Sequence, residues 1–260
     1  MEFANLRIVK RPPLAILTID RPQVLNALNA ATLVELSAAC EDLSAEAAIR
    51  VILLTGAGER AFVAGADIRE LAELTSEEGR AFALRGQELF RRLETMGKPV
   101  IACIRGFALG GGCELAMACS LRLASEDARL GQPEVKLGIM AGYGGTQRLP
   151  RLVGRGTGLK LLLTGAIIEA REALRIGLVD EVLPAAELMP RAEALAREIA
   201  ANAPLAVAET LLAVDEGIDL PLDLALLREA AHFGHLCGTA DKHEGTQAFL
   251  EKRPPAWKGE

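Results

Sequence analysis

The N-terminal part of the chain alternates apolar and polar residues in a pattern that predicts two strands and a helix. The alternating runs cover residues 7–10 and 14–19, and Pro12-Pro13 separates them. Asn29 then stands where it can cap a helix. The apolar positions of this helix recur at helical spacing and are Leu33, Leu36, Cys40 and Leu43.

Three further apolar runs predict buried strands. They cover residues 51–54, 100–104 and 121–124, and each is short and rich in aliphatic residues. The stretch from Gly56 to Asp67, rich in Gly and Ala, predicts a loop. Thr75 is followed by Glu78 in the spacing of a capping box. A helix is therefore expected after it, ending near Gly97, with Phe82, Leu89, Phe90, Leu93 and Met96 facing inward.

Beyond residue 183 the pattern is helical only. One set of apolar residues at helical spacing is Leu188, Ala192, Leu195, Ala196 and Ile199; a second is Leu220, Leu224, Leu227 and Ala231. A last helix is expected from Asp241 to Arg253, where Pro254 ends it. The order of elements therefore predicts an α/β body followed by a helical C-terminal module.

Bulk properties narrow the function classes. The chain has 260 residues, 50% of them hydrophobic, which is typical of a folded globular protein. A net charge of −6 argues against a general nucleic-acid binder. No apolar run approaches the roughly 20 residues of a membrane span, and residues 1–10 lack the apolar segment of a signal peptide. We therefore expect a cytoplasmic protein without nucleic-acid or membrane partners.

The metal-ligating residue types predict no metal site. The five cysteines stand in apolar or small-residue surroundings without a C-x-x-C pair, so buried free thiols are expected at Cys40, Cys103, Cys113, Cys119 and Cys237. His232, His235 and His243 lie close in sequence, and a helix surface or a subunit contact is favoured over a metal site. With no other histidine, a Ser-His-Asp hydrolase is hard to build.

The glycine run Gly110-Gly111-Gly112 is the first candidate for chemistry. It follows a buried strand and precedes a short helix, expected from Glu114 to Ala118. Glycines let backbone approach a ligand, and the first N–H groups of a helix lack internal partners. Such a turn suits an anion or an oxygen that becomes anionic. Close packing of the helix against the strand is an equally good interpretation of the glycines alone.

Two glutamates are candidates for acid–base catalysis. Glu114 has apolar or small neighbours, which predict burial, and a buried carboxylate needs a partner or a raised pKa. Glu134 lies in a turn, Gly131-Gln132-Pro133-Glu134, where a solvated side chain is the alternative. If the two carboxylates share a cleft, their pKa values separate and give one acid and one base, as hydration requires.

The remaining glycine-rich stretches carry less weight. A backbone N–H in residues 65–68 could be a second donor to an oxyanion, and Asp67 is expected to cap the next segment. Residues 154–158 do not follow a strand and predict a turn rather than a dinucleotide loop. Residues 142–145 predict a loop that enters a helix.

Taken together, these motifs resemble the crotonase (enoyl-CoA hydratase/isomerase) superfamily, and most of all its enoyl-CoA hydratases. The resemblance covers nearly the whole chain. Its segments are 21–28, 61–68, 98–102, 106–115, 131–134, 144–149 and 249–253. The glycine-rich block together with Gly-Gln-Pro-Glu makes it specific.

The resemblance implies a fold and an assembly. It implies a crotonase-type spiral of ββα units over residues 1–200 and a helical region over 201–260 that mediates homotrimers, often paired into hexamers. It implies an oxyanion hole made by the backbone N–H groups of Ala66 and Gly111, with Glu114 and Glu134 as catalytic residues. Substrate contacts are implied at Leu25, Ala64, Asp67, Ile68, Arg69, Gly142 and, toward a neighbouring subunit's CoA, Lys252.

The implied reaction is syn hydration of a trans-2-enoyl-CoA to a 3-hydroxyacyl-CoA, as in fatty-acid degradation. Coenzyme A is then part of the acyl-CoA substrate, and no cofactor is expected. Isomerisation of enoyl-CoA, hydration of methylglutaconyl-CoA, and a non-catalytic acyl-CoA-binding or RNA-binding role are the alternatives; retention of both glutamates favours a hydratase. Residues 140–143 depart from the family's usual Pro-Gly in a loop near the acyl end, which leaves the acyl-length preference open.

Overall fold

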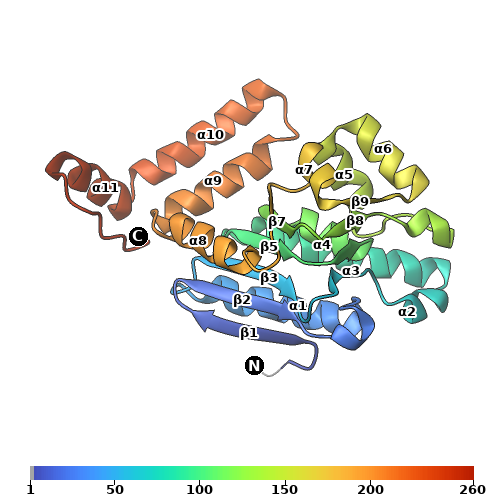
Figure 1. Ribbon diagram of the computed structural model, residues 1–260. Coiled ribbons are helices and arrows are strands. Elements are labelled where there is room, and N and C mark those ends of the chain that lie inside the picture. The colour runs from blue at the N-terminus through green and yellow to red at the C-terminus, as the bar shows by residue number, and fades with distance from the viewer. Residues whose placement is uncertain (1–2) are drawn as a thin grey trace.

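The computed structural model describes residues 3–260 and contains two β-sheets enclosed by helices (Figure 1). The larger sheet has the strand order β1-β2-β3-β5-β7-β10, with β1 antiparallel to β2 and the other neighbours parallel. Its strands are β1 (Leu6–Arg11), β2 (Leu14–Ile19), β3 (Val51–Gly56), β5 (Val100–Ile104), β7 (Leu121–Ser125) and β10 (Glu181–Leu183).

The smaller sheet has the order β4-β6-β8-β9, and only the β8–β9 pair is antiparallel. Its strands are β4 (Ala61–Val63), β6 (Phe107–Leu109), β8 (Arg129–Gly131) and β9 (Ile167–Glu169). Strands of the two sheets alternate along the chain, so that β3, β5 and β7 are each followed directly by a strand of the smaller sheet. This alternation produces the repeated ββα units that the resemblance implied.

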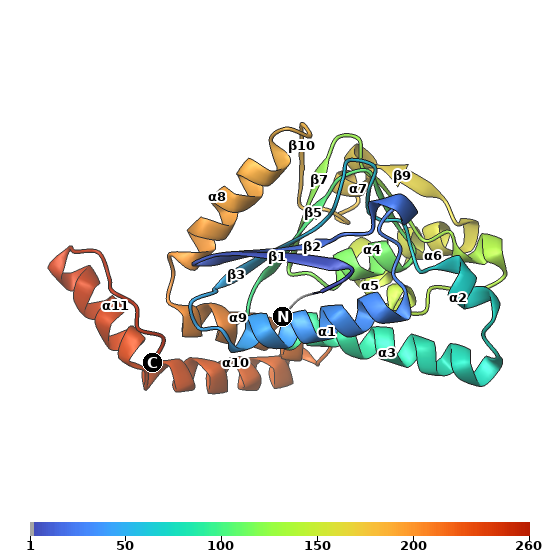
Figure 2. The same cartoon turned by 90° about the horizontal axis from the view of Figure 1, so that it is seen from below.

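Alternate residues of the central strands pack against helices on opposite faces of the larger sheet. Leu17, Ile52 and Leu54 belong to the main core, together with apolar residues of α1 (Ala30–Ala45), α3 (Ser76–Thr95) and α4 (Gly111–Met117). Leu53 and Ile101 face the other way, onto α8 (Leu188–Ala200). Figure 2 shows α1 and α3 side by side on one face, with α8 on the other. Burial on both faces explains why these strands are continuous apolar runs.

Helical caps predicted from the sequence are present. The Asn29 side chain accepts from the Thr32 N–H at the start of α1, and Thr75 and Glu78 form the complete capping box of α3. Asp67 caps the short helix α2 (Ile68–Ala72) by accepting from the Arg69 N–H.

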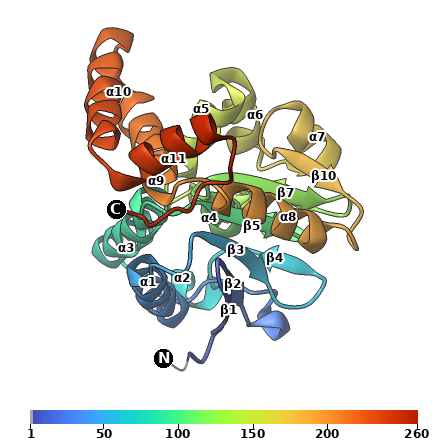
Figure 3. The same ribbon diagram turned by 90° about the vertical axis from the view of Figure 1, so that its left-hand side faces the viewer.

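The C-terminal helices extend from one side of the body (Figures 1 and 3). Helix α9 (Pro204–Gly217) contacts α3, and α10 (Leu222–Cys237) packs along α9. Helix α11 (Ala240–Glu251) follows, and Leu220 lies before α10 rather than in it. Within residues 3–260, none of the helices combines the length and apolar character that a membrane crossing requires. The cytoplasmic location and the division at residue 200 stay predictions.

Three sequence predictions were wrong in detail. The expected loop from Gly56 to Asp67 contains strand β4, whose three residues are too few to show a period. The expected turn at 154–158 is the first part of helix α6 (Arg155–Thr164), where Gly156 and Gly158 have helical neighbours. Cys237 is exposed at the end of α10, although the other four cysteines are buried.

Candidate active site

The glycine turn places helix α4 against strand β4. Gly110 has φ of 49°, which favours glycine, and α4 begins at Gly111 rather than at Glu114. A Cβ on Gly112 would lie 2.0 Å from the carbonyl oxygen of Val63. Packing therefore accounts for Gly112, and the other two glycines lie beside a cavity.

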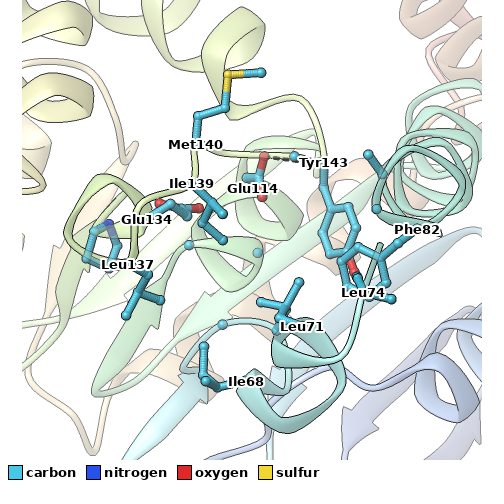
Figure 4. Close-up of a pocket in the computed structure, with 18 of the residues that line it drawn as sticks. Ile68, Leu71, Leu74, Phe82, Glu114, Glu134, Leu137, Ile139, Met140 and Tyr143 are labelled. Atoms are coloured by element: carbon cyan, nitrogen blue, oxygen red, sulfur yellow. Dashed lines mark hydrogen bonds between the residues drawn. The ribbon is translucent and has the colours of Figure 1, made fainter. Parts of the chain in front are cut away.

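This cavity has a volume of about 370 Å³ and contains both predicted glutamates (Figure 4). Its inner wall includes Ala66, Gly111 and Tyr143, and its side walls are mainly apolar. Several exposed apolar side chains line it as well, namely Ile68, Leu137, Ile139 and Met140. Such a cavity, apolar with a few convergent polar groups, suits a small acyl group.

Glu114 is buried on the first turn of α4, with 1% of its surface exposed. Its Oε1 accepts a hydrogen bond from the Tyr143 N–H at 2.8 Å (Figure 4). It also accepts one from the Gly145 N–H at 2.7 Å. Burial raises the pKa of Glu114 to about 7, and the hydrogen bonds oppose that rise. A carboxylate with this pKa can exchange a proton near neutral pH.

Glu134 approaches the same cavity from the first residue of the 3₁₀ helix η2 (Glu134–Leu137). A Cβ on Gly110 would lie 3.0 Å from its Oε1, so the glycine makes room for this carboxylate. The buried Gln132 amide, with its NH₂ turned toward Glu134, donates to Oε1 at 2.7 Å and to Oε2 at 3.2 Å. Burial raises the pKa of Glu134, and its charge in turn raises the pKa of Glu114.

The backbone N–H groups of two residues that line the cavity, Ala66 and Gly111, are the candidate donors to a substrate oxygen. Ala66 pairs with Leu28 in a parallel bridge in which Gly65 O and Asp67 N make the hydrogen bonds. The Ala66 N–H therefore points the other way, and its nitrogen lies 3.6 Å from the position of a Cβ on Gly111. Within residues 3–260, neither the Ala66 nor the Gly111 N–H donates to a protein acceptor. Two such donors on residues that line one cavity are what an oxyanion hole requires.

The predicted substrate-binding residues separate into two groups. Ala64, Ile68 and Gly142 line the cavity. Leu25 does not line it, and its carbonyl oxygen instead accepts from the Ala64 N–H at 3.0 Å, which positions that segment.

The other predicted substrate residues lie further away. Asp67 caps α2 and pairs with Arg21, which confirms its predicted capping role. Arg69 is exposed on α2, outside the cavity lining. Lys252 is the C-cap residue of α11 and does not line the cavity. Helix α11 lies at the opposite end of the molecule from α2, whose Ile68 and Leu71 line the cavity (Figure 1). A contact between Lys252 and substrate would need a neighbouring subunit, and it stays a prediction.

Tyr143 is a residue of the site that the sequence did not single out. Its ring is 2% exposed and packs on Phe82 and Phe90, with centroid distances of 5.1 and 5.4 Å. A Cβ on Gly86 of α3 would lie 2.1 Å from the ring. The sequence feature that could have indicated its role is a lone tyrosine beside glycines. Its contact with α3 is a tertiary feature, however, and no local sequence pattern shows it.

The described part of the chain brings no group of three or more His, Cys, Asp or Glu together as a metal-binding set. His232 and His235 on α10 instead contact Glu209 on α9, the latter at 3.0 Å. Burial raises the pKa of the Cys113 thiol beside Glu114 to about 12, so it is not a nucleophile at neutral pH.

A family model described as enoyl-CoA hydratase/isomerase matches residues 11–260. The chain belongs to the enoyl-CoA hydratase/isomerase family. Among curated relatives, a short-chain-enoyl-CoA hydratase of Clostridium acetobutylicum is 49% identical over 97% of both chains. A crotonyl-CoA hydratase of Syntrophomonas wolfei is 47% identical, again over 97% of both.

Solved structures agree with this assignment to the enoyl-CoA hydratase/isomerase family. The crystal structure of an enoyl-CoA hydratase from Bacillus anthracis superposes with a TM-score of 0.95 at 42% identity, covering 98% of this chain and 100% of that one. The predicted family and the predicted α/β fold class are therefore confirmed. The chemical roles of the site residues are proposals.

Proposed function

We propose that the protein catalyses syn addition of water to a trans-2-enoyl-CoA, giving a 3-hydroxyacyl-CoA. The observation that carries this proposal is that one apolar cavity is lined by a buried carboxylate, a half-buried carboxylate and two residues whose backbone N–H groups have no protein acceptor within residues 3–260. Each feature supplies one requirement of the reaction, namely a base, an acid and a site for the thioester oxygen. The names of the curated relatives describe the same chemistry.

The proposed oxyanion hole makes the double bond electrophilic. The N–H groups of Ala66 and Gly111 bind the thioester oxygen and stabilise the enolate that forms when water attacks C3. Removing one such donor typically costs ~10²-fold or more in rate. Since this stabilisation comes from the backbone, the proposed mechanism requires neither a metal nor a cofactor, and coenzyme A enters only as part of the substrate.

The two glutamates handle the protons. The ionised Glu114 takes a proton from water as its oxygen bonds to C3, and the protonated Glu134 gives a proton to C2. After turnover Glu114 holds a proton and Glu134 is ionised, so exchange with solvent restores the pair. Burial raises the pKa of Glu114 to about 7 and also raises the pKa of Glu134, so both side chains exchange protons closer to neutral pH than an exposed carboxylate does.

A homotrimer, or a hexamer of paired trimers, is the proposed assembly. It is supported by α9, its C-cap residue and α10, which expose large apolar side chains in the single protomer: Val214, Ile218, Leu222, Leu226, Leu227 and Phe233. Contiguous apolar surface of this kind marks a protein interface.

The proposed function is tested with crotonyl-CoA. Adding the protein should lower the absorbance of the conjugated thioester until equilibrium is reached, and mass spectrometry should show a product heavier by one water. Binding of crotonyl-CoA without this change would support a non-catalytic acyl-CoA-binding protein instead. Parallel assay of a 3-enoyl-CoA detects isomerisation, the sibling reaction.

A further inference from the structure

The segment Gly142–Gly145 provides both hydrogen bonds to Glu114, and the carbonyl oxygens of its peptide units are themselves hydrogen-bonded. The Gly142 carbonyl oxygen accepts from Gln87 Nε2 of α3 at 2.8 Å. In a trans peptide the N–H points opposite to the C=O. This bond therefore directs the Tyr143 N–H toward Glu114.

The next-but-one peptide unit is fixed in the same way. The Gly144 carbonyl oxygen accepts from the Arg148 backbone N–H at 2.8 Å, at the start of helix α5 (Gly145–Val153). The Gly145 N–H, at the other side of that unit, consequently points to Glu114.

The peptide unit between these two is turned the other way, and a side chain holds it. The Tyr143 carbonyl oxygen accepts from Arg148 Nη1 at 2.9 Å. Arg148 is in turn bound by Glu94 of α3 through two hydrogen bonds, Nη2 to Oε2 at 2.9 Å and Nε to Oε1 at 2.5 Å. The two side chains are only 17% and 20% exposed, so this bidentate pair is largely shielded from solvent.

The glycine at position 144 makes this arrangement possible. Gly144 has φ of 112°, and a Cβ there would lie 2.2 Å from Arg148 Nη1. A side chain at position 144 would therefore have to displace the guanidinium from the Tyr143 carbonyl oxygen.

We propose that Arg148, held by Glu94, is a positioning residue that fixes the Tyr143–Gly145 backbone and thereby aims the Glu114 carboxylate at water. This inference rests on the proposed function, in which Glu114 is the base. Charge acts in the same direction as geometry. Burial, and to a smaller extent Glu134, raise the pKa of Glu114, whereas the Gly145 and Tyr143 N–H groups and the positive Arg148 lower it.

The test is Arg148→Met, with Arg151→Met as the matched control. Arg151 lies on the same helix and pairs with Asp219 at 2.9 Å, but touches none of the peptide units that hold Glu114. Arg148→Met should lower kcat for crotonyl-CoA roughly 10- to 100-fold with KM little changed, since misplacement of a catalytic group costs this much. Arg151→Met should keep both constants.

The pH profile separates positioning from simple loss of stability. Glu114 must be ionised to act as the base, so the low-pH limb of kcat follows its pKa. Without the Arg148 charge that pKa rises, and the limb should move to higher pH in Arg148→Met. Arg148→Lys should keep the limb near its wild-type position yet still lose kcat, because one ammonium cannot replace the bidentate guanidinium.

Titration of ¹³C-labelled glutamate by NMR, with Glu114→Gln for assignment, gives a readout independent of turnover. An upward shift of the Glu114 titration in Arg148→Met supports the inference. If the wild-type protein fails to hydrate crotonyl-CoA, that failure overturns only the proposed function, and the titration still tests the inference. Unchanged kcat, pH limb and titration in Arg148→Met would overturn the inference. If Arg148→Met does not fold, kcat is measured for Glu94→Gln and Gln87→Leu, in which the same fall is expected. A wild-type kcat in both variants would overturn the inference.

Discussion

At the scale of single residues, the site depends on the burial and hydrogen bonding of its side chains, and the sequence predicted these only in part. Glu114 could be predicted because its neighbours along the helix are all apolar or small. The contact between Glu134 and the buried Gln132 amide could not, because it depends on how a turn folds back over Gly110. The resemblance identified both glutamates, whereas their hydrogen bonds came from the structure.

We expect the Tyr143 side chain to limit the length of the acyl chain, and this gives a testable prediction. Its ring closes the cavity against Phe82 and Phe90. Tyr143→Ala should therefore raise kcat/KM for C8 and C10 enoyl-CoA relative to C4 by at least ~10-fold. One methylene group in a fitted hydrophobic pocket changes kcat/KM by roughly 10- to 200-fold. Steady-state kinetics over a C4–C10 series measures this ratio.

Tyr143→Phe is the matched control, since it keeps the ring. Within the described residues the Tyr143 hydroxyl is buried and has no hydrogen-bond partner, which costs about 1–3 kcal/mol. The phenylalanine variant should therefore keep the C4 preference and melt at a higher temperature. A C4–C10 ratio in Tyr143→Ala equal to that of wild type would show that Tyr143 does not limit chain length.

At the scale of elements, long periodic segments were predicted well and short ones were not. The strands at 51–54 and 100–104 and the helix capped by Thr75 are buried or amphipathic over enough residues to show a pattern. Strands β4, β6, β8 and β9 have three residues each, fewer than any period can reveal. They form the smaller sheet, and β6 leads directly into the glycine turn.

The contact between α4 and β4 gives a prediction for Gly112. Gly112→Ala would place a methyl group 2.0 Å from the Val63 carbonyl oxygen. The variant should be destabilised by about 1–3 kcal/mol, as is typical of overpacking, and should lose hydratase activity because α4 carries both Gly111 and Glu114. Chemical denaturation and the crotonyl-CoA assay measure the two effects.

Gly156→Ala is the control for Gly112→Ala. Gly156 is also inside a helix, and a Cβ there has no other atom within 4 Å. This substitution should be neutral or stabilise the protein by about 0.4–1 kcal/mol through the unfolded chain. Equal stability of the two variants would contradict the close packing of α4 on β4.

At the scale of the whole molecule, the α9–α10 region accounts for the proposed assembly. Phe233 is 69% exposed in the protomer, although an aromatic side chain of this size is usually covered. Phe233→Glu should reduce the mass in solution from about three or six times 27.6 kDa toward that of one protomer. Light scattering coupled to size exclusion provides the mass.

Val34 offers a matched control, since it is 68% exposed on α1 rather than on α9 or α10. Val34→Glu should leave the oligomer intact. Dissociation by both variants, or by neither, would argue that the α9–α10 face is not the interface.

The central claim is that Glu114 and Glu134 act together to hydrate an enoyl thioester, and the most direct test is the hydration rate of folded Glu114→Gln and Glu134→Gln with crotonyl-CoA. Glutamine keeps the size of the side chain and removes its proton transfer. Each substitution should lower kcat by ~10²-fold or more, as loss of a general acid or base does, with circular dichroism unchanged. If either folded variant hydrates crotonyl-CoA near the wild-type rate, the proposed roles of the two carboxylates are wrong.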